Sequence, residues 1–197
     1  MDFANSTELD TARLEQLFVR YSWPYRHDKL KVRVRNSRGA DFSGTCFYGR
    51  PRIFVNLGRH NRYPYVLRTQ VAKSRSNDTC WWRESYRLML TDPYQLALFV
   101  YLHEFYHYLV KQSGHNVRRK EAMCDRFATR VLVDHFGLRL TDKHGGTVPR
   151  ARWDIQDLDR FVDAAPRGGL QSLLFNKPRP RPRPIPVIIR GVRSGRR

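Results

Sequence analysis

Leu-His-Glu-Phe-Tyr-His-Tyr-Leu, residues 102–109, places two histidines four positions apart inside an apolar run. Positions i and i+4 lie on one face of an α-helix, so His103 and His107 can direct two imidazole nitrogens towards one ion. Glu104 follows the first histidine, as in His-Glu-x-x-His sequences that bind zinc and use the glutamate as a general base. The stretch therefore predicts a helical metal site, provided that the chain supplies a third ligand.

The residues around this stretch predict a buried helix over about 92–112. Asp92 can cap its N-terminus, Pro93 suits the first helical position, and Gly114 can end it. An unpaired histidine or glutamate in a buried helix would be costly, so the burial favours a metal. Apolar residues surround the helix on most sides, which is typical of a buried element: Leu96, Leu98, Phe99, Val100, Leu102, Phe105, Leu109 and Val110.

A third ligand is needed because a catalytic zinc keeps three protein ligands and one open position. A second helix is expected over about residues 117–136, and Glu121 in its first turn is the preferred candidate. Ser113 stands where the three-histidine metzincin pattern would have its last ligand, so that pattern fails. His115 is a less favoured alternative, since it lies beyond the glycine that ends the first helix. Cys124 is interpreted as a small core residue.

Glu121 and Asp125 lie on one face of the second helix and form a Glu-x-x-x-Asp pair. This pair resembles the third-ligand motif of gluzincins, the thermolysin-like metallopeptidases. The string Glu-x-x-Cys-Asp-x-Phe-Ala, residues 121–128, is similar to that of ImmA/IrrE-type metallopeptidases, with cysteine where alanine is usual. The resemblance spans about residues 92–136. It implies a minimal zincin-like α+β domain, in which a small mixed β-sheet packs on the active-site helix and the following glutamate helix.

These residue types suggest a division of roles. His103, His107 and Glu121 would hold Zn²⁺, which lowers the pKa of a bound water to about 7. Glu104 would act as the general base that takes the proton from this water during attack on a carbonyl carbon. Asp125 is spaced to bond the free ring nitrogen of His103 and fix its tautomer, with an ordinary solvent-facing aspartate as the alternative. The roles predict a zinc-dependent endopeptidase that hydrolyses a protein or peptide.

Substrate contacts are less well defined by the sequence. By the same resemblance, a substrate strand would pair with the sheet edge above the active helix, and residues 52–57 are the expected edge. Tyr63, Tyr86 and His60 are candidates for stabilising the oxyanion, and the sequence gives no ground for choosing among them.

Upstream of the metal-binding helix, the pattern predicts one helix followed by three strands. The helix is expected to start at a capping box formed by Thr7 and Asp10. The first strand alternates apolar and basic residues, which indicates a half-buried strand with a basic outer face. Gly39 and Gly44 are interpreted as a turn. The expected elements are a helix at 8–21 and strands at 30–35, 45–48 and 52–57.

The remaining segments are less regular. Residues 58–80 are basic and contain few periodic positions, apart from one short expected strand at 66–71. A short helix is expected after Asp154, which is interpreted as its cap. We therefore expect one metallopeptidase domain over 1–170 and a disordered basic tail over 171–197.

The chain is strongly basic, with 37 Lys and Arg against 18 Asp and Glu, and a net charge of +19. A charge this large indicates an acidic partner such as nucleic acid. In residues 177–197, arginine alternates with proline and no acidic residue occurs, which favours extended polyproline II. This tail could neutralise phosphates, bind an aromatic groove, or have no partner. The alternative function is thus a nucleic-acid-binding protein whose zincin core is structural or inactive.

Cysteine usage and hydropathy indicate the compartment. Cys46, Cys80 and Cys124 lack a Cys-x-x-Cys spacing, so neither a disulfide framework nor a cysteine zinc site is indicated. The first residues do not resemble a secretory signal, and no apolar run approaches the ~20 residues that span a bilayer. A cytoplasmic protein without membrane contact is expected.

Overall fold

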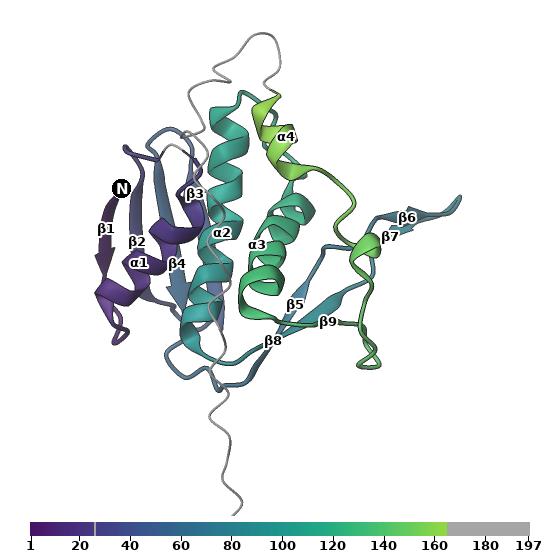
Figure 1. The fold of residues 1–197 in the computed structure, drawn as a ribbon, viewed down its shortest axis with the longest axis horizontal. Helices are drawn as coiled ribbons and strands as arrows, with labels where there is room; N and C mark the ends of the chain where they lie inside the picture. The colour runs from purple at the N-terminus through teal and green to yellow at the C-terminus, as the bar shows by residue number, and fades with distance from the viewer. Residues whose placement is uncertain (26, 165–197) are drawn as a thin grey trace, which may run out of the picture.

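The computed structural model describes residues 1–25 and 27–164, which form a mixed α+β fold. Figure 1 shows a main sheet with α1 across it, then α2 and α3, with a smaller sheet near the foot of α3. The predicted α+β class is confirmed, whereas the predicted tail at 171–197 lies outside the described residues. In chain order the elements are β1 (Asp2–Asn5), α1 (Thr11–Ser22), β2 (Lys31–Asn36), β3 (Phe42–Phe47), β4 (Arg52–Leu57), β5 (Tyr65–Thr69), β6 (Arg75–Ser76), β7 (Trp81–Trp82), β8 (Tyr86–Leu90), α2 (Pro93–Gln112), α3 (Glu121–Phe136), β9 (Leu140–Thr141), a 3-10 turn (Arg150–Arg152) and α4 (Leu158–Asp163).

The main sheet has the strand order β1-β2-β4-β3. Strands β1, β2 and β4 run parallel, and β3 pairs antiparallel with β4. The predicted edge at 52–57 is therefore wrong, because β4 lies between β2 and β3. Three of the last four residues of β4 are apolar and all four are at least half-buried, as is usual for an interior strand. The edge strand beside α2 is β3, which starts earlier than the predicted 45–48.

The inner face of the main sheet packs against α1 and α2. Val32, Val34, Ile53 and Val55 are almost fully buried there, as period-two alternation predicted. From α1, Phe18 stacks on Tyr101 of α2, with ring centroids 4.2 Å apart. Helix α2 thus packs against the main sheet, α1 and α3.

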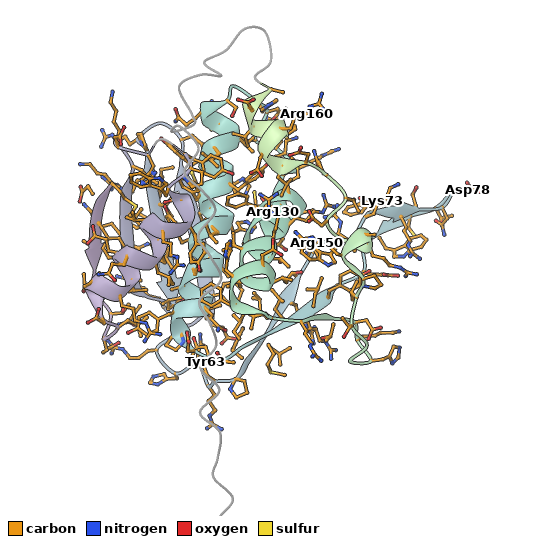
Figure 2. The ribbon with its side chains drawn as sticks, viewed as in Figure 1. Tyr63, Lys73, Asp78, Arg130, Arg150 and Arg160 are labelled. Atoms are coloured by element: carbon orange, nitrogen blue, oxygen red, sulfur yellow. The ribbon has the colours of Figure 1, made fainter. Side chains whose placement is uncertain are left out.

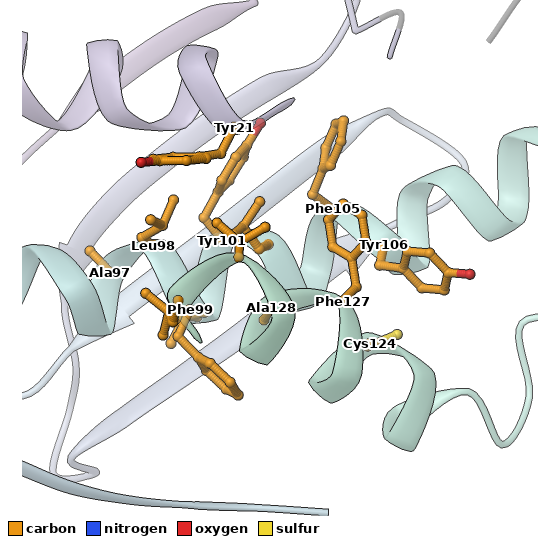
Figure 3. Close-up of a cluster of buried hydrophobic side chains, with 14 of the residues drawn as sticks. Tyr21, Ala97, Leu98, Phe99, Tyr101, Phe105, Tyr106, Cys124, Phe127 and Ala128 are labelled. Carbon is orange, nitrogen blue, oxygen red and sulfur yellow. The ribbon is translucent and has the colours of Figure 1, made fainter. Parts of the chain in front are cut away.

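Figure 3 shows the packing between α2 and α3, where aromatic rings interlock with small residues. The ring of Tyr106 lies 5.0 Å from that of Phe127, and its hydroxyl donates to the Leu158 carbonyl of α4. Ala128 and Cys124 are fully buried in the same layer, so α3 can approach α2 closely. This close approach brings the first turn of α3 to the histidines of α2.

Local capping residues set the helix ends. The Asp92 side chain accepts the Gln95 backbone N–H at 2.9 Å, and Pro93 follows, which confirms the predicted start of α2. Helix α3 ends at Gly137, whose φ of 66° suits a residue without a side chain. Two predicted caps are wrong. Asp10 alone caps α1, which starts at Thr11, and Asp157 rather than Asp154 caps α4.

The segment at 58–80 is more regular than expected. It contains β5, which pairs antiparallel with β8 in the smaller sheet of order β5-β8-β9. It also contains β6, which forms a hairpin with β7 that projects from the body in Figure 1. Strands β1, β6, β7, β8 and β9 were not predicted, and all of them except β8 have only two to four residues, too few to show alternation. Within the described residues, no helix is both long and apolar enough to cross a membrane.

Candidate metal centre

His103 and His107 present their rings to the first turn of α3. Their ring centroids lie 5.1 Å apart, as i and i+4 positions on one helix face require. The Glu121 carboxylate spans both rings, with Oε2 3.1 Å from His103 Nε2 and Oε1 3.2 Å from His107 Nε2. The residues that the sequence predicted as ligands are thus brought together by the packing of α3 on α2.

Asp125 holds the other side of the His103 ring. Its Oδ1 lies 2.8 Å from His103 Nδ1, and its Oδ2 accepts the backbone N–H of Gln70 at 2.7 Å. Burial alone would lower the pKa of His103, but hydrogen bonds with Asp125 and Glu121 outweigh it and raise the pKa to about 10. The aspartate therefore links α2, α3 and the end of β5; the sequence predicted its contact with His103 but not its contact with Gln70.

The charges around His103 favour a cation between its Nε2 and Glu121. Because Asp125 accepts the proton on Nδ1, a neutral His103 directs its Nε2 lone pair at a carboxylate oxygen. Two lone pairs at 3.1 Å repel unless a proton or a metal ion lies between them. Two imidazole nitrogens and a carboxylate form a donor set that binds divalent metals. His107 differs, since its buried Nδ1 has no hydrogen-bond partner among the described residues.

Cys124 lies closer to the histidines than the sequence suggested. The ligand atoms of His103, His107 and Cys124 all lie within 4.8 Å of one another, so this group could hold a metal ion. The cysteine is fully buried, and burial raises the pKa of its thiol well above the usual value. It is a core residue, as predicted, but its sulfur is also within reach of the centre. The sequence indicated this proximity only by spacing, because Cys124 follows Glu121 by three residues, which is nearly one helical turn.

Glu104 lies next to the histidines on α2, with its carboxylate against the edge strand β3. Burial raises the pKa of its carboxyl group, while His103 and the Cys46 backbone N–H act in the opposite direction. Gly44 of β3 leaves room for it, because a Cβ there would lie 2.3 Å from Glu104 Oε1. The prediction that Gly44 belongs to a turn is wrong. A glycine in a strand often marks a close approach, and that is its role here.

The other predicted candidates lie elsewhere. His115 directs Nε2 to the Phe161 carbonyl at 2.7 Å and stacks on that ring, so its side chain packs on α4. The Tyr86 hydroxyl donates to Glu84, and His60 lines a cavity of about 580 Å³ formed by residues 36–41 and 58–61. Figure 2 places Tyr63 at the foot of the molecule, in the loop before β5.

Tyr48 was not predicted as a site residue, although it lies near the centre. Burial is the largest cause that raises its pKa to about 12, and the charges of Glu104 and Glu121 contribute. Its position directly after β3 explains this proximity. The only available sequence signal was a tyrosine at the end of an expected strand.

Comparison with known proteins identified no relative. No family model, no curated protein and no solved structure matches this chain. The interpretation of the centre therefore depends on its geometry alone.

Proposed function

We propose that this protein is a zinc-dependent endopeptidase. The observation that supports the proposal most strongly is the Glu121 carboxylate, which faces His103 Nε2 and His107 Nε2 at 3.1 and 3.2 Å. Asp125 at the same time holds His103 Nδ1 at 2.8 Å, as second-sphere carboxylates do for zinc-bound histidines. The three ligands come from two helices that a shared core holds in place.

His103, His107 and Glu121 would hold Zn²⁺ through two nitrogens and one oxygen. The ion would supply a Lewis acid that polarises a carbonyl group and brings the pKa of a water to about 7. Glu121 is preferred over Cys124 because its carboxylate already contacts both rings and is easily ionised. Hydrogen bonds from both histidines hold the pKa of Glu121 far below its usual value. The Cys124 thiol would have to lose a proton inside the core.

Glu104 is proposed to be the general base. Its side chain adjoins His103 in sequence yet faces β3, so it can accept a proton without occupying a ligand position. Burial raises its pKa towards the range in which a carboxylate accepts a proton and then returns it to a leaving amine. Gly44 and the Cys46 N–H fix the carboxylate against the strand, which limits the orientations it can adopt.

The edge strand β3 suits an extended peptide as the substrate. One side of β3 pairs with β4, and its other side has no strand partner among the described residues. Such an edge binds a peptide through main-chain hydrogen bonds and needs no particular side chains. Because Gly44 of this strand touches Glu104, a peptide paired there would pass beside the general base.

Glu104→Gln tests this function. The full chain should cleave a fluorescently labelled, unfolded protein such as casein, and the variant should bind zinc and fold normally but lose cleavage by about 100-fold or more. Glu15→Gln is the matched control, because Glu15 is exposed on α1 and far in sequence from the centre. Undiminished cleavage by the Glu104 variant would exclude the proposed role.

A further inference from the structure

The outer face of the main sheet, opposite α1 and α2, is both basic and aromatic. Three rows of side chains cross β2, β4 and β3 there, because paired residues on neighbouring strands point to the same side. Among the described helices, only α2 makes extensive contact with β3 and β4, and it lies on the inner side. The rows are Lys31, Arg52 and Phe47, then Arg33, Phe54 and Thr45, then Arg35, Asn56 and Ser43.

Phe54 lies at the centre of this outer face and is surrounded by cations. The Arg35 guanidinium lies 4.0 Å from its ring centroid, and that of Arg52 lies 5.9 Å away. The Phe47 ring meets it edge-on with centroids 5.4 Å apart, and Phe47 is 45% exposed. Planar groups therefore lie side by side on an open surface, which suits stacking of further planar groups.

Two of the arginines have no neutralising carboxylate among the described residues. Asp2 pairs with Lys31 at 3.8 Å and with Arg33 at 3.0 Å. Within the part of the chain that the structure describes, Arg35 and Arg52 form no ion pair. Arg35 is nevertheless held in place, because its Nε donates to Asn56 Oδ1 at 2.6 Å. A fixed, unneutralised guanidinium is preorganised for an anion.

The outer face continues into a polar cavity of about 640 Å³ at one end of the sheet. Arg35 and Arg38 both line it, so a second guanidinium joins the first at this end. Hydroxyl and amide groups supply further hydrogen bonds to an anion, as in many phosphate contacts. The polar lining includes Ser6, Ser37, Ser43 and Asn56.

We infer that the outer face binds single-stranded nucleic acid, with bases stacked on Phe47 and the Phe54–arginine cluster and phosphates at Arg35, Arg52 and Arg38. Sheet faces that combine exposed aromatics with cations recognise unpaired bases in this way. The chain's own segment at 177–197 is an unsuitable occupant, because it is basic and would be repelled. This surface lies on the opposite side of the sheet from Glu104, so it is independent of the proposed peptidase activity.

Binding to a labelled oligothymidylate of about 20 nucleotides, measured by fluorescence anisotropy with the full chain, tests the inference. Arg35→Ala with Arg52→Ala should weaken binding by about tenfold or more and reduce the slope of log K against log salt by about 1.4. Phe47→Ala should weaken binding by about fivefold or more and leave that slope unchanged, because stacking releases no counterions.

The matched control is Arg118→Ala with Arg139→Ala, which removes the same charge from exposed loops on either side of α3. It should bind nearly as wild type, and thermal melting should show that all variants fold. Equal losses in this control and in the outer-face variant would overturn the inference, because binding would follow net charge. Equal binding of inorganic polyphosphate or of anionic vesicles, without an effect of Phe47→Ala, would likewise overturn it.

Discussion

Asp125 Oδ1 and His103 Nδ1 lie 2.8 Å apart, and the other oxygen of Asp125 accepts the Gln70 backbone N–H. The aspartate therefore orients the histidine and is itself oriented by the chain that follows β5. The geometry of the centre therefore depends on α2, on α3 and on the segment that follows β5. A change at Asp125 should act on the metal through His103, because Asp125 lies on the far side of the ring from Glu121.

Asp125→Ala should weaken zinc binding by about 10- to 100-fold, since the His103 ring would lose the acceptor that fixes its tautomer. Competition with a chromophoric chelator measures this affinity. Asp78→Ala is the control, because Asp78 lies at the exposed tip of the β6–β7 hairpin in Figure 2. Wild-type affinity in the Asp125 variant would show that the contact does not support the centre.

Glu121→Gln and Cys124→Ala separate the two candidate third ligands. We expect the glutamine variant to lose zinc affinity by about 100-fold, because an amide is a much poorer ligand than a carboxylate. The Cys124 variant should keep its zinc and lose about 1 kcal/mol of stability from a small cavity. The same chelator competition, with urea unfolding for stability, gives both values. The reverse ranking would assign the ligand to the cysteine.

Gly44→Ala should impair catalysis without removing the metal. The new Cβ would meet Glu104 Oε1 at 2.3 Å, so the carboxylate proposed as the general base must move while His103 and His107 keep their places. We expect kcat/KM to fall by about tenfold or more, with zinc content near that of wild type. Gly49→Ala is a matched control, because a Cβ there meets no atom of the described residues within 4 Å. Equal activity of the two variants would contradict the positioning role of Gly44.

Removal of the metal should destabilise the fold. A ligand present at about 1,000 times its dissociation constant stabilises the folded state by about 4 kcal/mol, and chelation removes that contribution. Differential scanning calorimetry should therefore show a lower Tm with EDTA for the wild-type chain. Glu121→Gln should show a much smaller change. A Tm of the wild type that does not respond to chelation would indicate that no metal supports the fold.

The helix spacing of the sequence predicted much of the centre. The i, i+4 spacing of His103 and His107 needs only a helix, and the Asp92-Pro93 start with its apolar surroundings predicted that helix. Glu121 and Asp125 repeat the same spacing. Their contact with the histidines depends on how α3 packs on α2, which periodicity alone does not predict.

Contacts between segments that lie far apart in the sequence were not predicted. Nothing local indicates that Gly44 meets Glu104, or that β4 lies between β2 and β3, because strand order depends on pairing across the whole sheet. Gln70 contacts Asp125 through a backbone N–H, which any residue other than proline provides. The alternation on β2 correctly predicted a strand with a basic outer face. The aromatic residues of β4 and β3 lie on the same face because of the strand register, which the sequence pattern did not show.

X-ray absorption at the zinc edge of the purified full chain identifies the atoms that bind the metal. We expect zinc bound to two imidazole nitrogens at about 2.0–2.1 Å, with oxygen as the remaining ligand type. A sulfur ligand at about 2.3 Å would instead place Cys124 in the centre and contradict the assignment of Glu121. A folded chain that contains no zinc, and takes up none when zinc is supplied, would contradict the proposed metallopeptidase as a whole.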